Sequence, residues 1–376
     1  MSNISAKPNP RYRILLQKRN IKNNFFKNFI FFKTGREATL FGLKELKIDK
    51  KKTILIPGYI CNSLIAPIIK EGFKVEFYDI NKNFSVDVKY LKKTIENKKI
   101  SALLIVHYFG FLMDIKEVYN FCKSNNIELI EDYCHSFLTR VFSEESEIKN
   151  TTKIYSLRKI IPITDGGAIE NMNFNKVNIS CKINFNKNEF IFLVFRFIES
   201  LINRIGIINL YCHFFQNFKK KVKIVKSLFI KKLLGNFIIR IKKPSYMLNR
   251  YINSEEYLYD IYSKRRKNYN FLLNEINKLD IEIVFKKISD YSVPQFFPIL
   301  LNEKNKFLFN YLNKNGIETI KWPNYEIPEE VLNNKKKFKN SNFFNLNIIL
   351  IPVHQSLNKD DCKRIINTIR SFLNNK

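Results

Sequence analysis

Two apolar segments of strand length, residues 101–111 and 127–137, enclose a stretch whose apolar residues recur at helical spacing. The residues of that helical pattern are Ile115, Val118, Tyr119 and Cys122. A strand, a helix and a second strand in this order predict an α/β fold with a parallel sheet. Open sheets of this kind bind ligands at the carboxyl ends of their strands. Because Asp132 follows the mostly apolar run 127–130 with only Glu131 between them, we expect it at a ligand site, with His135 three residues further on.

A segment with the sequence KIYSLRKIIPITDGGAI follows, spanning residues 153–169. It places Lys159 shortly before a tight Asp-Gly-Gly turn, and Arg158 is the immediate neighbour of this lysine. Desolvation or a neighbouring cation favours loss of the lysine proton, which makes the amine a nucleophile toward a carbonyl. Pyridoxal phosphate supplies such a carbonyl, and it also needs a carboxylate at its ring nitrogen and a cradle for its phosphate. The alternative is that Lys159 is an ordinary surface lysine.

The sequence offers a candidate for each of these two needs. Asp132 could keep the pyridine nitrogen protonated, which makes the ring an electron sink, although a helix-capping carboxylate would look the same. Thr34 and Gly35 precede a helical pattern over residues 36–46, and the free N–H groups at a helix start bind phosphate. An ordinary N-cap is the alternative for this second feature.

The order of these segments resembles the DegT/DnrJ/EryC1/StrS family, the pyridoxal-phosphate-dependent sugar aminotransferases of fold type I. The resemblance covers residues 28–170 and resumes in the segments 265–273 and 347–369. Its blocks are TGREATLFGL, TILIPGYICNSLIAPIIKEGFKVEFYDIN, VHYFGFLMDIKEVYNFCKSNNIELIEDYCHSF, YSLRKIIPITDGGAI, RRKNYNFLL and NIILIPVHQSLNKDDCKRIINTI. It implies the cofactor pyridoxal 5'-phosphate, an amino-acid donor, expected to be glutamate, and a nucleotide-linked keto-sugar as acceptor, in the biosynthesis of surface polysaccharide or glycoconjugates. It also implies a homodimer with active sites at the subunit interface.

The resemblance assigns roles to individual residues. It implies that Lys159 binds the cofactor covalently and moves the proton, and that Asp132 faces the pyridine nitrogen. His135 would lie near the ring oxygen of the cofactor or just behind it. Sugar dehydratases of the family carry histidine in place of the lysine, so the lysine here favours aminotransfer. The phosphate would meet the turn formed by Gly35, Arg36 and Glu37.

Two positions depart from the pattern of the family. Ser156 is the hydroxyl nearest to the phosphate-binding serine, but two residues separate it from Lys159 where the family commonly has four. The aromatic residue that often stacks on the cofactor ring aligns with Cys61, which cannot stack. We therefore name Tyr59 as the candidate replacement.

The patterns and the resemblance together predict a fold type I α/β enzyme of two domains. A loose basic tail over residues 1–24 would precede the large pyridoxal-phosphate-binding domain, residues 25–250, which has a mostly parallel sheet between helices. A smaller α+β domain would span residues 251–376. In it we expect strands at 295–301 and 348–352 and a closing helix at 359–373.

The chain is strongly basic, with 65 Lys and Arg against 34 Asp and Glu and a formal charge of +31. Such a charge fits a nucleic-acid or anionic-membrane binder, or a compositional drift toward Lys, Asn, Ile, Phe and Tyr. No RNA-binding or helix-turn-helix motif accompanies the charge, so we expect no nucleic-acid partner. The four histidines and six cysteines show neither zinc-site spacing nor a disulfide framework, and the first residues do not resemble a signal peptide. These features predict a cytoplasmic protein without a metal site.

Residues 188–250 form a basic amphipathic segment whose only acids are Glu189 and Glu199. No stretch of it reaches 18 residues without a charge, which disfavours a membrane-spanning helix. The segment could pack on the large domain or on a second subunit, or it could lie on an anionic membrane surface and make the protein peripheral at the inner membrane. The rival function is a catalytically inactive aminotransferase-like protein that binds anionic membranes through Lys219, Lys220, Lys221 and Lys223.

Overall fold

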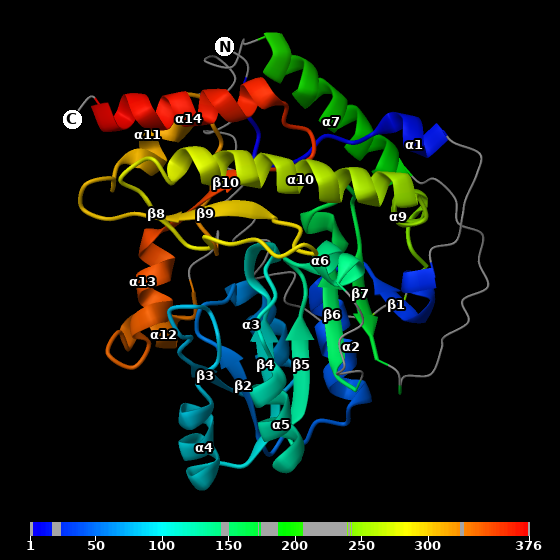
Figure 1. Ribbon diagram of the computed structural model, residues 1–376. Coiled ribbons are helices and arrows are strands. Elements are labelled where there is room, and N and C mark those ends of the chain that lie inside the picture. The colour runs from blue at the N-terminus through cyan, green and yellow to red at the C-terminus, as the bar shows by residue number, and fades with distance from the viewer. Residues whose placement is uncertain are drawn as a thin grey trace.

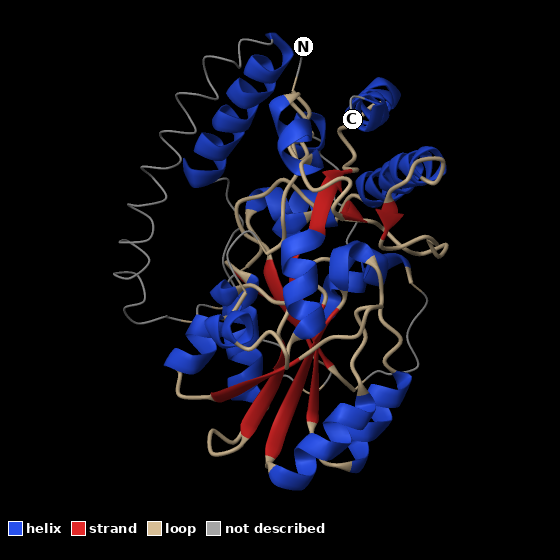
Figure 2. Ribbon diagram, turned by 90° about the vertical axis from the view of Figure 1, so that its left-hand side faces the viewer, coloured by secondary structure: helices blue, strands red, loops and turns tan. Residues whose placement is uncertain are grey.

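The computed structural model describes residues 3–16, 24–143, 150–171, 173, 187–205, 239, 241, 243–323 and 327–374. Two sheets organise these residues, one of seven strands and one of three (Figure 1). The three-stranded sheet and its helices lie above the seven-stranded sheet in this view, and Figure 2 shows the same arrangement from the side.

The large sheet has the strand order β1-β7-β6-β5-β4-β2-β3. Its strands span Phe29–Phe32 (β1), Thr53–Pro57 (β2), Lys74–Tyr78 (β3), Ile100–Val106 (β4), Glu128–Asp132 (β5), Thr152–Ser156 (β6) and Gly167–Glu170 (β7). The strands from β3 to β6 pair in parallel, and β7 runs antiparallel to both β6 and β1. Every residue of β2 and β4 is buried, as expected for parallel strands covered on both faces. The predicted α/β class with a mostly parallel sheet is therefore confirmed.

Helices connect the strands of the large sheet. They span Gly35–Glu45 (α2), Asn62–Lys70 (α3), Val88–Asn97 (α4), Lys116–Ser124 (α5) and Phe137–Phe142 (α6). Short 3-10 turns span Asn24–Asn28 (η1), Tyr108–Gly110 (η2) and Leu157–Lys159 (η3). The predicted strand, helix and strand are β4, α5 and β5, and α5 buries Val118 and Cys122 of the helical pattern. Since β4 and β5 are parallel neighbours, the carboxyl end of each lies at the same edge of the sheet.

The small domain contains a three-stranded antiparallel sheet with the order β10-β9-β8. Its strands span Glu282–Ile283 (β8), Phe296–Leu300 (β9) and Ile348–Pro352 (β10). The helices in this part of the chain span Tyr246–Ile252 (α9), Glu255–Ile276 (α10), Leu308–Lys314 (α11), Glu329–Asn333 (α12), Lys339–Asn347 (α13) and Lys359–Asn374 (α14). The helices α10 and α14 contact each other above the sheet (Figure 1). The strands and the closing helix predicted here are confirmed, whereas the domain boundary at residue 250, which falls inside α9, stays a prediction.

The N-terminal segment corrects the expectation of a loose tail. Over residues 3–16 the chain is packed on the rest of the protein, with Ile4 in a parallel bridge to Ile317 of the small domain. A short helix, α1, spans Tyr12–Leu16 and buries two of its apolar residues. The basic composition of the segment concealed these few apolar anchors, which supply the free energy for docking.

The basic segment is described in part. Its first helix, α7, spans Lys187–Ile205. Lys219, Lys220, Lys221 and Lys223 lie outside the described residues.

Candidate active site

Asp132 is the last residue of β5 and lies, 9% exposed, at the carboxyl edge of the large sheet. In register it lies beside Ile154 of the neighbouring strand β6. Its Oδ1 accepts a hydrogen bond from the N–H of Cys134 at 2.7 Å. The alternative role as a helix cap does not hold, because α6 begins at Phe137 with Ser136 at its N-cap. A carboxylate at this edge fits the place where open α/β sheets bind ligands.

Glu131, the preceding residue, anchors the same strand end from the opposite face of the sheet. Its fully buried carboxylate accepts hydrogen bonds from His107 Nε2 at 3.1 Å, from the Tyr133 hydroxyl at 2.9 Å and from the Thr151 hydroxyl. The ammonium of Lys153 lies 3.9 Å away. Burial alone would raise the pKa of Glu131, but the hydrogen bond from His107 and the other donors outweigh burial and lower this pKa. The network therefore keeps a stable negative charge behind Asp132 and fixes the strand end.

Lys159 ends η3, the 3-10 turn that directly follows β6. The N–H of Leu157 donates to the carbonyl of Gly166 at 2.8 Å, which closes the loop that contains the lysine. Gly166 has a φ of +115°, in the left-handed region that glycine adopts at little cost. The Lys159 side chain is exposed, so burial does not desolvate this amine. Its charge nevertheless acts on the edge of β5: burial lowers the pKa of His135 well below its usual value, and the charge of Lys159 lowers it further.

The N-terminus of α2 meets the same edge through two glycines. A Cβ at Gly167 would lie 2.1 Å from the carbonyl carbon and oxygen of Thr34, so only glycine allows this approach. A Cβ at Gly35 would lie 3.2 Å from Cys134 Sγ and 3.5 Å from Ser156 Cβ. The first N–H groups of a helix lack acceptors within it, and the positive end of its dipole favours anions. The helix start is thus positioned as an anion cradle against the carboxyl ends of β5 and β6.

Two guanidinium groups belong to this cradle. Partial desolvation lowers the pKa of Arg158, and the nearby charge of Arg36 lowers it further. Cations held close together beside a helix start favour a phosphate dianion between them. Glu37 caps the helix: its N–H donates to Thr34 Oγ1 at 3.4 Å, and its Oε2 accepts from the N–H of Lys33 at 3.2 Å, while its contact with a phosphate stays a prediction. This arrangement resembles a capping box.

The other two predicted cofactor contacts differ in their surroundings. Ser156 is the buried last residue of β6 and lies opposite Gly167 in register, next to the cradle. Its contact with a phosphate stays a prediction. Tyr59 is 0% exposed, and its hydroxyl donates to the Trp322 carbonyl at 2.7 Å. Its ring packs near those of Tyr108 and Phe84, with centroids 5.6 Å and 6.2 Å away, and this burial argues against stacking on a cofactor.

His135 forms a buried aromatic wall with two residues that the sequence did not single out. Its ring stacks on Phe109 at 5.6 Å between centroids and meets Trp322 edge-on at 4.8 Å. Its Nδ1 accepts from the N–H of Phe109 at 3.5 Å, which assigns the ring proton to Nε2. Because its pKa is lowered by burial, the ring is neutral near pH 7. The sequence contained one indication of this wall, namely the only tryptophan of the chain, which lies in the segment KWP.

Arg265 of α10 ties the small domain to the lysine loop and was also missed. It is 1% exposed, and its Nη1 donates to the carbonyls of Pro294 at 3.1 Å and Gln295 at 2.9 Å. Its Nε donates to Gln355 Oε1 at 2.9 Å. Burial lowers the pKa of Arg265 to about 9. The blocks RRKNYNFLL and IPVHQSL contain the two side chains, but their pairing is visible only in three dimensions.

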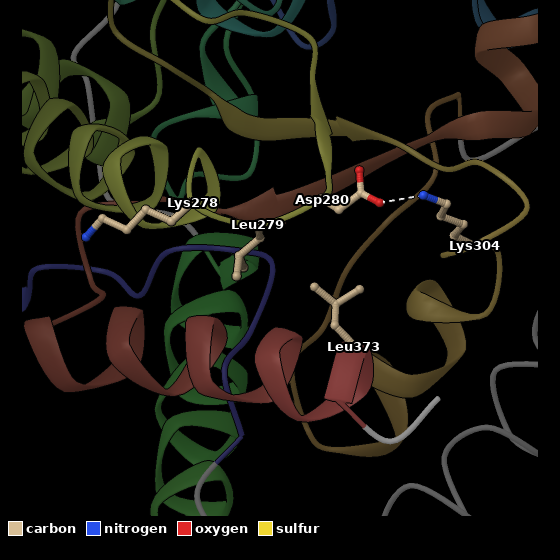
Figure 3. Close-up of a pocket in the computed structure, with 5 residues that line it drawn as sticks. All are labelled: Lys278, Leu279, Asp280, Lys304 and Leu373. Carbon is tan, nitrogen blue, oxygen red and sulfur yellow. Dashed lines mark hydrogen bonds and ion pairs between the residues drawn. The ribbon is translucent and has the colours of Figure 1, made fainter.

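A surface hollow of about 450 Å³ lies elsewhere, on the small domain (Figure 3). Its lining residues are Lys278, Leu279, Asp280, Lys304 and Leu373. Lys304 and Asp280 form an ion pair of 2.8 Å within it. None of these residues belongs to the large sheet or to the lysine loop, so the hollow lies apart from the candidate site.

The residues at the sheet edge fit pyridoxal phosphate. Three groups meet at one edge: the exposed amine of Lys159, the carboxylate of Asp132 and the cradle formed by α2. The cradle can form because Gly167 has no Cβ, which would otherwise collide with Thr34. These are the three groups that the chemistry of this cofactor requires.

Solved structures support the fold independently. One is Helicobacter pylori PseC, an aminotransferase involved in the biosynthesis of pseudoaminic acid, which superimposes with a TM-score of 0.66 at 14% identity over 100% of both chains. Another is the PMP-form of the putative sugar aminotransferase Spr1654 from Streptococcus pneumoniae, with a TM-score of 0.66 at 13% identity over 99% of this chain and 98% of that one. These similarities confirm the fold type I architecture.

Sequence comparison gives the family. A UDP-4-amino-4,6-dideoxy-N-acetyl-beta-L-altrosamine transaminase of Campylobacter jejuni is 27% identical over 80% of this chain and 74% of its own length. A GDP-perosamine synthase of Vibrio cholerae is 25% identical over 36% of this chain and 37% of its own. The sequence profile of the DegT/DnrJ/EryC1/StrS aminotransferase family matches residues 26–175 and 255–370. The chain therefore belongs to the DegT/DnrJ/EryC1/StrS aminotransferase family and is a pyridoxal-phosphate-dependent sugar aminotransferase.

Proposed function

We propose that this enzyme takes the amino group of glutamate and transfers it to the keto group of a sugar linked to a nucleoside diphosphate, for a surface polysaccharide or glycoconjugate. The observation that carries the proposal is the meeting of the Lys159 loop, Asp132 and the α2 cradle at one edge of the sheet. The similar proteins with UDP- and GDP-linked sugars in their names support a nucleotide-linked acceptor. The Campylobacter jejuni protein is named a transaminase, which supports amino transfer.

Pyridoxal phosphate, when bound, supplies the carbonyl that receives the amino group and the conjugated ring that stabilises negative charge. The chain supplies the rest. The Lys159 amine would hold the cofactor and then move a proton as general base and acid at the reacting carbon. The Asp132 carboxylate would keep the ring nitrogen protonated, and its bond to the Cys134 N–H fixes its orientation.

His135 and the cradle position the ring and the phosphate. A neutral His135 has its proton on Nε2 and can donate one hydrogen bond to a ring oxygen without adding positive charge. The N–H groups at the start of α2 would bind the phosphate together with Arg36 and Arg158. Ser156 lies close enough to this cradle to add a hydroxyl.

The setting of the enzyme belongs to the same proposal. We expect a homodimer in the cytoplasm, with glutamate as the donor and weak contact with an anionic membrane surface. The rival function, an inactive protein that binds membranes, is not favoured, because the family profile covers residues 26–175 and 255–370 and the resemblance implies a cofactor-binding lysine at position 159.

The test is a two-stage reaction with purified protein. In the first stage the protein with pyridoxal phosphate is mixed with glutamate, and 2-oxoglutarate formation is measured. In the second stage UDP- and GDP-linked 4-keto-6-deoxy sugars are added separately, and amino-sugar nucleotides are identified by mass spectrometry. We expect one molecule of 2-oxoglutarate per active site in the first stage and one accepted sugar class in the second. A protein that loads the cofactor but forms no 2-oxoglutarate from glutamate would disprove glutamate as the donor.

A further inference from the structure

The helix α7 presents an apolar surface to solvent. Seven apolar side chains along it are exposed, among them Phe195 at 64% and Phe190 at 58%. All seven are Phe190, Ile191, Val194, Phe195, Phe197, Ile198 and Leu201. Their spacing places them on one broad side of the helix, because residues three and four apart share a face. Figure 1 and Figure 2 show α7 along the outer margin of the molecule, at the end away from the large sheet.

Two charged residues of α7, Glu189 and Arg196, point the opposite way, whereas Lys187 at its first position is exposed and Glu199 is half-exposed in an ion pair with Arg196. Glu189 is 0% exposed, and its Oε1 accepts from the N–H of Met247 at 2.8 Å. Arg196 is buried, and its Nη2 donates to the Pro8 carbonyl at 2.7 Å and to Asn9 Oδ1 at 3.1 Å. A helix on the surface of a water-soluble domain normally buries its apolar side and exposes its charges. In α7 this polarity is inverted, which indicates that its outer face is covered by something apolar.

Charge decides between the two apolar surfaces that could cover this face. Pairing α7 with α7 of a second copy would place the basic residues around this helix opposite one another, so like charges disfavour this face, but not others, as the interface of the expected homodimer. From Glu199 to Glu255 the sequence has no other Asp or Glu, and the N-terminal segment that contacts α7 exposes Lys7 and Arg13. An anionic lipid surface offers both an apolar interior and the opposite charge.

We propose that α7 lies in the headgroup region of an anionic membrane, with its seven exposed apolar side chains inserted. The rest of the protein packs against the opposite side of this helix, where Glu189 and Arg196 are buried. This inference deepens the membrane contact suggested above by assigning it to one helix. No helix among the described residues is long and apolar enough to cross a bilayer, so the contact is peripheral. The lysine loop and the cradle lie on other elements, so the contact would place the enzyme at the membrane without taking part in its chemistry.

The test is sedimentation of the full-length protein with vesicles of phosphatidylglycerol and phosphatidylcholine, compared with phosphatidylcholine alone. The triple variant Phe190→Ser, Phe195→Ser and Ile198→Ser removes three inserted side chains and keeps a similar helix propensity. We expect its partition constant for the anionic vesicles to fall by at least about tenfold. Binding of the wild type should also weaken at an ionic strength of about 1 M, where the Debye length is about 3 Å.

A matched control replaces three equally exposed side chains elsewhere, as Tyr259→Ser, Phe307→Ser and Leu346→Ser. This variant should bind vesicles within about twofold of the wild type, because those side chains lie outside α7. Glutamate half-reactions and circular dichroism of every variant separate loss of membrane contact from loss of the enzyme or of the fold. The proposal is overturned if the wild type does not sediment with anionic vesicles, or if both triple variants lose binding equally. It is also overturned if the α7 variant changes only the oligomeric state, which would make the helix a subunit interface.

Discussion

Arg265 and Ile160, separated by 105 positions in the chain, are joined by a hydrogen bond of 3.4 Å from the guanidinium Nη2 to the carbonyl oxygen. Gln355 Nε2 donates to the same oxygen at 3.3 Å. Ile160 is the residue after Lys159, so a buried cation of the small domain holds the loop that presents the reactive amine. The loop position is thus set by contacts between the two domains and not by the loop alone.

Removing this guanidinium should destabilise the protein and loosen the loop. Arg265→Met leaves the carbonyls of Pro294, Gln295 and Ile160 without this donor, and we expect a loss of about 3 kcal/mol in the free energy of unfolding. Urea unfolding measures this change. The control Lys264→Met removes an exposed ion pair to Asp260 and should cost less than about 1 kcal/mol. Equal losses in the two variants would show that Arg265 has no special role.

The close approach of the α2 start to β7 requires a residue without a side chain at Gly167. Gly167→Ala would place a methyl group 2.1 Å from the backbone of Thr34, which must then move away from β7. We expect a stability loss of about 3 kcal/mol and weaker binding of pyridoxal phosphate, measured by equilibrium dialysis. In the control Gly42→Ala, the new Cβ would lie 2.7 Å from the end of the Ile169 side chain, which can shift, and 3.5 Å from Thr152 Cγ2, an ordinary van der Waals distance. If Gly167→Ala binds the cofactor as tightly as the wild type, the cradle does not hold the phosphate.

Asp132 tests the electronic part of the mechanism. Asp132→Asn keeps the shape and the acceptor for the Cys134 N–H but cannot hold the pyridine nitrogen protonated. We expect the half-reaction with glutamate to slow by at least about 100-fold, while the dissociation constant of the cofactor changes much less. Stopped-flow absorbance gives the rate, and dialysis gives the binding. A wild-type rate in this variant would leave Asp132 with a structural role alone.

His354 makes stability depend on pH. Its Nε2–H donates to the carbonyl of Ser5 at 2.8 Å, and burial lowers its pKa from 6.5 to about 3. The folded state therefore excludes a proton that the unfolded chain binds below pH 6.5. Stability from this group is complete above about pH 6.5 and falls by about 1.4 kcal/mol per pH unit down to about pH 3.

The measurement is urea unfolding at about pH 7.5 and about pH 5, in the wild type and in His354→Gln. Glutamine can still donate to Ser5 but binds no proton in this range, so the variant should lose about 2 kcal/mol less than the wild type on acidification. Buried His135 has a pKa lowered in the same direction, so some pH dependence should remain in the variant. An unchanged pH dependence would contradict the assignment to His354.

The features predicted correctly from sequence are those that local pattern determines. β10 was predicted at its observed bounds and β9 within one residue at each end, because each is a short apolar run. Asp132 was placed at a strand end because a run of apolar residues stops directly before its acidic pair. The site residues that sequence reasoning missed are Phe109, Arg265 and Trp322, whose neighbours come from distant parts of the chain. The N-terminal tail was misjudged because a few buried apolar residues outweigh a basic composition.

We propose the central chemical role for Lys159, so its removal should be the most damaging single change at the site. Lys159→Ala eliminates both the amine that holds the cofactor and the group that moves the proton, so we expect turnover to fall by at least about 1,000-fold. The control Lys33→Ala removes another exposed lysine close to the cradle and should leave turnover within about twofold of the wild type.

The most direct measurement is borohydride reduction of the purified protein loaded with pyridoxal phosphate, followed by digestion and mass spectrometry. We predict that the near-visible absorbance of the cofactor disappears and that the cofactor mass is found on the peptide containing Lys159. The Lys159→Ala variant should carry no such mass at any lysine. Cofactor attached to a different lysine of the wild-type chain, or none attached after loading, would contradict the assignment of Lys159 and with it the proposed mechanism.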